Sequence, residues 1–177
     1  MPTEGKQLLD LARKAIDSKL DSKELTVDSQ IKENFNEPKG CFVTLYLDEQ
    51  LRGCIGYPQP VSPLWKAIIS AARAAAFSDP RFPKLSKDEF ERVRIEISVL
   101  TIPEKIEEGL PDCIKVGEDG LIVEAPHSSG LLLPQVAKEQ GWDSKNFLEH
   151  TCLKAGLDKD EWQECDVYKF QAQVFSE

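Results

Sequence analysis

Residues 40–56 read GCFVTLYLDEQLRGCIG, and this stretch decides the fold that we expect. Apolar and β-branched residues fill 40–47, which is typical of a strand, and the segment LRGCIG at 51–56 has the length of its partner. Asp48, Glu49 and Gln50 lie between them as a short polar connection. The sequence therefore predicts two antiparallel strands joined by a three-residue loop.

A hairpin that closes symmetrically around this loop has one wholly apolar face, which must be the buried one. The facing pairs on that side are Leu47 with Leu51, Leu45 with Gly53, and Val43 with Ile55. The outer face carries Phe42, Thr44, Tyr46, Arg52, Cys54 and Gly56. In this register Cys54 lies opposite Thr44, and Arg52 lies opposite Tyr46. Arg52 and Cys54 then point the same way, with Cα atoms roughly 6.5 Å apart.

The outer face carries a guanidinium and a thiol, which are groups that can bind a ligand or react with it. A guanidinium beside a thiol favours the thiolate, the nucleophilic form of cysteine. Gly53 and Gly56 leave room for a close approach by a ligand or by backbone. The four residues could form a shallow site for a carboxylate or a phosphate. From spacing alone, however, a packing explanation is favoured, in which Cys54 is a small buried hydrophobe, Arg52 a surface charge and the glycines allow a helix to pack closely.

Helical patterns surround the hairpin. An apolar repeat of 3.6 residues predicts a helix over 4–20, and LWKAIISAARAAAF predicts a second that ends at residue 77, with Ser62 as N-cap and Pro63 in its first turn. The prolines of DPRFP, residues 79–83, must end this helix. Ser86 and Glu89 form a capping box for a short helix, and alternation over 93–99 predicts a half-buried strand.

The remaining sequence predicts further strands and helices. Short strands are expected at 113–116 and 121–124, a turn at HSSG (127–130), and a strand leading into a helix within LLLPQVAKEQ (131–140). Ser144 is expected to cap a helix that ends at Gly156. One terminal strand is expected within 166–175, with Tyr168, Phe170, Ala172 and Val174 on one face. The fold class is thus α+β, with a largely antiparallel sheet and flanking helices, in a single domain over residues 1–177.

Composition restricts the function classes. The net charge of −9 and the lack of a Lys/Arg stripe disfavour nucleic acid as a partner. No apolar run could span a membrane and the N-terminus shows no signal peptide, so we expect a cytoplasmic protein. The five cysteines and two histidines lack zinc-site spacing, and no phosphate loop, serine-nucleophile motif or dinucleotide motif is present. We therefore expect free thiols, no metal and no cofactor; the oligomeric state is left open.

Five other positions are weaker candidates. Asp79 and Arg81 flank Pro80, where Arg81 could meet an anion, although a structural turn is the simpler explanation. Glu96 could orient Arg52 or act as a base, although an exposed ion pair with a neighbouring strand is simpler. His127 and His150 are the only imidazoles available to pair with a cysteine, and both are more simply ordinary surface or core residues.

The motifs LRGCIG, GCFVTLY, DPRFP, EISVL, GEDGLIV, LLPQVAKEQGW and the closing Y-x-F resemble the AMMECR family, in the same order. The resemblance covers residues 40–175 and is typical of a compact prokaryotic, archaeal-type member. It implies an α+β protein with a larger lobe that holds both termini and a smaller lobe from the middle of the chain. It also implies that residues 51–56 face a cleft.

The resemblance shifts the preference at Arg52 and Cys54 from packing to function. Asp79, Arg81 and Glu96 match family motifs as well, whereas neither histidine does, which counts against a Cys/His pair. The family carries no established reaction, but prokaryotic relatives resemble parts of a system that includes a Memo-type protein and a radical-SAM protein.

Two hypotheses follow for the LRGCIG surface. In the first, the protein is an enzyme in which Cys54 is a nucleophile or redox thiol, Arg52 holds a small anionic metabolite, and Glu96 or water handles protons. Thr44, Gly53, Gly56, Asp79 and Arg81 complete the expected ligand site. In the second, the same surface recognises a partner protein or a metabolite without turnover. The lack of a convincing base or metal cluster motivates this second hypothesis.

Overall fold

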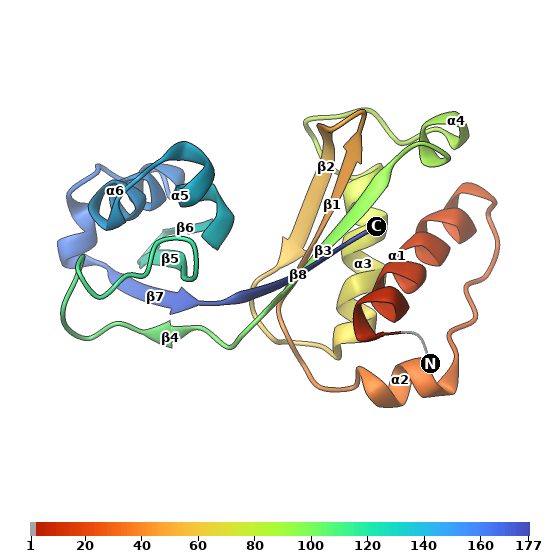
Figure 1. The fold of residues 1–177 in the computed structure, drawn as a ribbon, viewed down its shortest axis with the longest axis horizontal. Helices are drawn as coiled ribbons and strands as arrows, with labels where there is room; N and C mark the ends of the chain where they lie inside the picture. The colour runs from red at the N-terminus through yellow and green to blue at the C-terminus, as the bar shows by residue number, and fades with distance from the viewer. Residues whose placement is uncertain (1–2) are drawn as a thin grey trace. The chain divides into compact units, whose positions relative to one another are not determined.

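The computed structural model describes residues 3–177, which fold into two compact units. The first unit runs up to Leu100 and includes Gln173–Glu177, so it contains both ends of the described chain; the second is Thr101–Ala172. Each unit has its own antiparallel four-stranded sheet and its own hydrophobic core (Figure 1). The α+β class expected from the sequence is confirmed. No helix in residues 3–177 is long and apolar enough to cross a membrane.

The first unit places two long helices on one face of its sheet. Its elements are α1 (Glu4–Leu20), α2 (Ser29–Asn34), β1 (Cys41–Leu47), β2 (Gln50–Tyr57), α3 (Leu64–Phe77), α4 (Lys87–Phe90), β3 (Arg94–Leu100) and β8 (Ala172–Ser176). The strand order is β2-β1-β3-β8, so β2 lies at an edge. Helices α1 and α3 lie side by side against the sheet (Figure 1).

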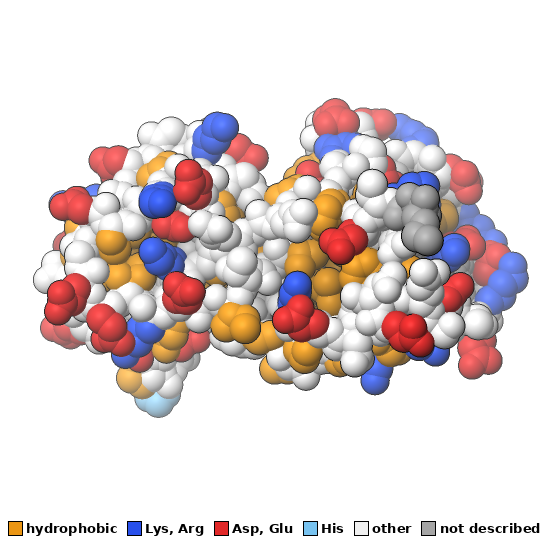
Figure 2. Space-filling model, turned by 60° about the horizontal axis from the view of Figure 1, so that its bottom comes forward, with side chains coloured by type: hydrophobic (Ala, Val, Ile, Leu, Met, Phe, Trp, Pro, Cys, Tyr) orange, Lys and Arg blue, Asp and Glu red, His pale blue; other side chains and the backbone are white. Residues whose placement is uncertain are grey.

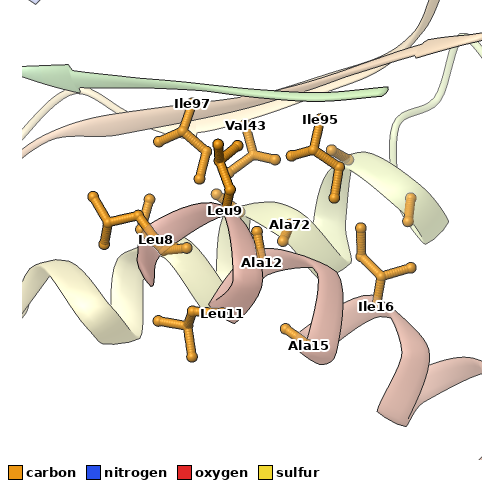
Figure 3. Close-up of a cluster of buried hydrophobic side chains, with 14 of the residues drawn as sticks. Leu8, Leu9, Leu11, Ala12, Ala15, Ile16, Val43, Ala72, Ile95 and Ile97 are labelled. Carbon is orange, nitrogen blue, oxygen red and sulfur yellow. The ribbon is translucent and has the colours of Figure 1, made fainter. Parts of the chain in front are cut away.

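The core of this unit follows from the two apolar periodicities. Val43, Ile95 and Ile97 point from the sheet toward the helices, where they meet apolar side chains of α1 and α3 (Figure 3). All three are fully buried, as are Ala12 and Ala72 on the facing helices. Alanine at the helix surface lets the helix axes approach the sheet closely. This packing fixes which face of β1 and β2 is left for the site.

The second unit contains β4 (Glu104–Lys105), β5 (Gly120–Ala125), β6 (Ser128–Leu132), α5 (Pro134–Gln140), α6 (Ser144–Lys154), η1 (Glu161–Glu164) and β7 (Asp166–Phe170). Its strand order is β4-β7-β5-β6. Its core contains Phe147, Leu148 and Val167.

Several local predictions for this second half are wrong. Residues 113–116 form turns rather than a strand, because Cys113 and Ile114 donate their amides back to Gly109 and Pro111. The turn expected over 127–130 is shorter, because Ser128 already begins β6.

The expected terminal strand is in fact two strands. The chain leaves one sheet after Phe170 and enters the other at Ala172. The expected common face of Tyr168, Phe170, Ala172 and Val174 is therefore wrong. The residues buried on β7 are Val167 and Phe170.

The helix bounds are predicted well, but two N-caps are not. The expected bounds of α1 and the expected end of α3 at Phe77 agree with the structure. Pro63 rather than Ser62 stands at the N-cap of α3, and Asp143 rather than Ser144 caps α6 through a hydrogen bond from the Asn146 amide. The predicted capping box of Ser86 and Glu89 is confirmed with both of its hydrogen bonds.

Candidate functional site

The β1–β2 hairpin turns more tightly than the sequence suggests. Asp48 and Glu49 form a two-residue turn with φ values of 51° and 62°, so Leu47 pairs with Gln50 and not with Leu51. A bulge at Arg52 then inserts one residue. Arg52 consequently has no partner residue on β1, and the expected pairing with Tyr46 is wrong.

Beyond the bulge, the predicted register is confirmed. Leu45 pairs with Gly53, Thr44 with Cys54, and Val43 with Ile55. The side chain of Cys54 is half-buried and receives a 3.2 Å hydrogen bond from the Thr44 hydroxyl to its sulfur. The thiol thus lies on the sheet face opposite the helices and is not sealed beneath α3.

The motif glycines are required by close packing. A Cβ atom at Gly53 would lie 2.2 Å from the carbonyl oxygen of Ala75 in α3, and one at Gly56 would lie 2.3 Å from the carbonyl oxygen of Cys41. The Phe42 ring is also within 2.4 Å of that second position. Helix and neighbouring strand therefore fill the space that these glycines leave, as the packing explanation requires.

Asp79 ties the loop after α3 to the motif strand. Its buried carboxylate accepts a hydrogen bond from the Cys54 amide at 3.0 Å through Oδ2. The same oxygen accepts from Nη2 of Arg81 at 2.8 Å, while Oδ1 accepts from Nε and the amide of Arg81 at 3.0 and 3.1 Å. The hydrogen bonds from Arg81 and the Cys54 amide hold the pKa of Asp79 well below its usual range, despite burial. Asp79 is therefore an ionised anchor.

Arg81 is the accessible cation of this site. Its side chain is 54% exposed, and the Asp79 carboxylate raises the pKa of Arg81 above its ordinary value. Arg81 also lies over the Phe82 ring, with its central carbon 5.4 Å from the ring centroid.

Arg52 has a different environment from the one expected. It is only 7% exposed, and its Nε and Nη2 form a two-pronged ion pair with Glu89 at 2.9 and 3.0 Å. Its Nη1 is buried with no hydrogen-bond partner among residues 3–177. Its central carbon lies 5.8 Å from the Phe82 centroid. Arg52 thus holds the far end of the 79–89 segment against β2.

Glu89 is a residue of this site that the sequence reasoning missed. The Arg52 side chain, followed by the Ser86 amide, lowers the pKa of Glu89 to about 2. The capping box signals the local role of Glu89, but no pattern links it to Arg52, which is 37 positions away.

Glu96 completes a row across three strands. Thr44 of β1 pairs with Cys54 on one side and with Glu96 of β3 on the other. Glu96 lies 3.7 Å from Nη1 of Arg94, which belongs to the same strand, so the ion pair expected with a neighbouring strand is wrong.

The two histidines lie elsewhere in the chain. Both His127 and His150 belong to the second unit, so the first unit contains no imidazole. His150 is stacked on Trp142 with ring centroids 3.8 Å apart. Within residues 3–177, His, Cys, Asp and Glu form no cluster of three or more that could hold a metal ion, and all five cysteines are free thiols.

The surface charge is mixed. On the face drawn in Figure 2, acidic and basic side chains are interspersed and no continuous basic stripe is visible. That face offers no support for nucleic-acid binding.

Comparisons with known proteins show what this chain is similar to. The family model described as AMMECR1 matches residues 9–175. A protein of Methanothermobacter thermautotrophicus is 49% identical, over 98% of this chain and 94% of its own length. A protein of Aquifex aeolicus is 46% identical, over 97% of this chain and 92% of its own. The crystal structure of an uncharacterised protein from Pyrococcus horikoshii has a TM-score of 0.90 and 47% identity, and covers 98% of this chain and 91% of its own.

Proposed function

Because this chain belongs to the AMMECR1 family, we propose that its LRGCIG surface binds a small anionic molecule at Arg81 and presents the Cys54 thiol to it. One observation carries the proposal: a single oxygen of Asp79 accepts hydrogen bonds from both the Cys54 amide and the Arg81 guanidinium. A thiol and an exposed positive charge are thereby held beside each other by an anchor that stays ionised.

The chemistry of the sulfur supports this reading. Thr44 donates a hydrogen bond to Sγ, and such a donor stabilises a thiolate. A nearby cation has the same effect and attracts a carboxylate or phosphate substrate. In this proposal Gly53 and Gly56 keep the strand close to its neighbours, and Arg52 positions the loop through Glu89. Glu96, or water beside Thr44, receives the proton.

A pair of alkylating reagents tests the site. Iodoacetate and iodoacetamide react alike with thiols, but only iodoacetate is an anion. We expect Cys54 to prefer iodoacetate by about threefold relative to Cys113, which is also half-buried, because Arg81 attracts the charged reagent. Peptide mass spectrometry measures both rates at each cysteine.

Arg81→Gln should abolish this preference, whereas Arg92→Gln should keep it, since Arg92 pairs with Asp48 in the hairpin turn. A Cys54 that reacts no faster than a thiol of the unfolded chain would contradict the reactive-thiol part of the proposal. A preference that survives in Arg81→Gln would contradict the role of Arg81.

A ligand-binding protein without turnover is the second candidate. Asp79 and Glu89 are both held ionised in ion pairs, and the first unit has no histidine, so Glu96 is the remaining carboxylate beside Thr44 that could act as a base. A thermal-shift screen of carboxylates and phosphates on wild type, Arg81→Gln and Cys54→Ser separates the two. A ligand that stabilises Cys54→Ser as strongly as wild type, and that wild type leaves unchanged on long incubation, indicates binding alone.

The proposed setting is the cytoplasm, where reducing conditions keep cysteines as thiols. We also propose that the protein acts together with a partner protein, such as the Memo-type and radical-SAM proteins that the resemblance suggests. We further propose that the two units form one functional domain.

A further inference from the structure

Arg73 differs from every other arginine of the chain. Each of the others forms an ion pair with a carboxylate: Arg13 with Glu177, Arg52 with Glu89, Arg81 with Asp79, Arg92 with Asp48, and Arg94 with Glu49 and Glu96. Arg73 forms none with any carboxylate of residues 3–177. In a chain with 31 acidic residues, an arginine without such a partner is unusual. Its charge is available to a ligand.

The position of Arg73 is nevertheless fixed. From α3 it donates through Nε to the carbonyl of Ala15 at 3.1 Å and through Nη2 to the hydroxyl of Ser18 at 3.0 Å, both on α1. Both acceptors are neutral, so these bonds orient the guanidinium without compensating its charge. The backbone carbonyl of Ser18 accepts a separate hydrogen bond from the Lys23 amide at 2.8 Å. Arg73 is half-buried, and Nη1 has no hydrogen-bond partner within the described part of the chain.

Arg73 lines a cavity of about 560 Å³ between the end of α1, the segment that follows it, and α3. Lys19 and Lys23 also line it, and Glu24 is the single carboxylate of the lining. Lys23 pairs with Asp21, whereas Lys19 forms no ion pair with a described residue. The charged lining is therefore net positive in a chain whose total charge is −9.

An apolar wall completes the cavity. Leu25, Trp65 and Ile69 lie in the lining on the side of α3 and the 22–27 segment. Lys32 and Lys66 lie over the Trp65 ring, 5.7 and 5.3 Å from a ring centroid, and add positive charge close to this wall. A few charged groups beside an apolar surface are the usual composition of a small-molecule site.

From these observations we infer that the cavity is a second binding site, for a small organic anion that combines a carboxylate or phosphate with a flat apolar body. The anionic group pairs with Arg73 and Lys19, because a guanidinium matches the geometry of both groups. The apolar body covers Leu25, Trp65 and Ile69. The inference is independent of the LRGCIG surface and uses none of its residues.

Phenyl phosphate is a suitable probe, because it combines an anionic group with a flat apolar ring. Inorganic phosphate, which lacks the ring, and benzyl alcohol, which lacks the charge, are partial matches. We expect phenyl phosphate to shift the indole N–H signal of Trp65 in a saturable way in 1H–15N NMR spectra. The indole signals of Trp142 and Trp162, both in the second unit, serve as internal controls. Each partial match should bind at least about tenfold more weakly, since each loses one set of contacts. Binding should weaken with added salt.

Arg73→Gln should weaken phenyl phosphate binding by about tenfold or more, and Arg92→Gln, which removes the same charge at the hairpin turn, should not change it. Lys19→Gln tests the site without touching the bonds that Arg73 makes to α1, and should weaken binding by about threefold. The inference is overturned if Trp65 shows no saturable shift. It is also overturned if Lys19→Gln and a folded Arg73→Gln bind like wild type. If Arg73→Gln does not fold, an unchanged affinity in Lys19→Gln alone overturns it.

Discussion

The carboxylate of Asp79 accepts a 3.0 Å hydrogen bond from the backbone amide of Cys54, which lies 25 positions earlier in the chain. This contact fixes the loop after α3 against the motif strand at the residue that carries the thiol. The Arg52–Glu89 ion pair fixes the same segment at its other end. These two contacts of the LRGCIG motif therefore position the loop that carries Arg81.

Asp79→Asn should destabilise the protein by about 3 kcal/mol, because the ion pair with Arg81 is lost. In addition, the side-chain amide of the new Asn has one acceptor oxygen and cannot accept from all the donors that now surround Asp79. Urea unfolding at neutral pH measures the change. Asp166→Asn, which removes an exposed carboxylate paired with Lys105, is the matched control and should cost less than about 0.5 kcal/mol. Equal losses in the two variants would mean that Asp79 is no anchor.

Glu89 should make stability depend on pH. Its pKa is about 2 in the folded protein against an ordinary value of 4.5, so its contribution to stability is complete above about pH 5 and is lost as the pH falls toward 2. The free energy of unfolding of wild type should therefore approach that of Glu89→Gln as the pH falls from 7 to 3. Asp79 changes the free energy of unfolding with pH in the same direction in both proteins, so its effect cancels in the difference between them. A constant difference over this range would show that Glu89 titrates normally.

Gly53→Ala should destabilise the protein by more than about 2 kcal/mol, because the new methyl group meets the Ala75 carbonyl at 2.2 Å and one of two packed elements must move. Gly5→Ala is the comparison, since its methyl group meets only the Phe175 side chain and the substitution favours helix. The Gly5 variant should lose less stability in thermal unfolding. If the two variants lose the same amount, the close contact with α3 does not explain Gly53.

The hairpin turn can be improved. Asp48 and Glu49 both adopt left-handed backbone conformations, which suit Asn and Gly far better. Asp48→Asn combined with Glu49→Gly should stabilise the protein by about 1 kcal/mol, read as a higher Tm. Glu49→Gln is the control, because it removes the ion pair with Arg94 without relieving the backbone. A drop in Tm for the double variant would show that the two ion pairs of the turn outweigh its strain.

The long periodic elements could be predicted from the sequence. The helix bounds of α1 follow from apolar spacing over many residues, and Thr44 pairs with Cys54 as the alternation requires. The pairing nearest the turn could not be predicted, because two features of opposite effect lie there. A turn one residue shorter than expected shifts the register, and the bulge at Arg52 restores it.

The contacts made by the candidate site residues were predicted only in part, for a related reason. LRGCIG and DPRFP mark the two segments that meet, but the ion pair of Arg52 with Glu89 was not predicted. Arg52 forms an ion pair with Glu89, and Arg81 is the exposed cation. Such partners depend on how a bulge turns one side chain toward a loop 37 positions away, and no local pattern records that.

The edge position of β2 gives the Asp79 contact one more consequence. An outermost strand offers unpaired amides to which a strand of another molecule can add, and this is how sheets polymerise. The Cys54 amide is such a group, and the Asp79 side chain occupies it. We therefore expect this contact also to oppose edge-to-edge pairing of β2, so loss of Asp79 should promote oligomers or fibres at concentrations where the native chain stays dispersed.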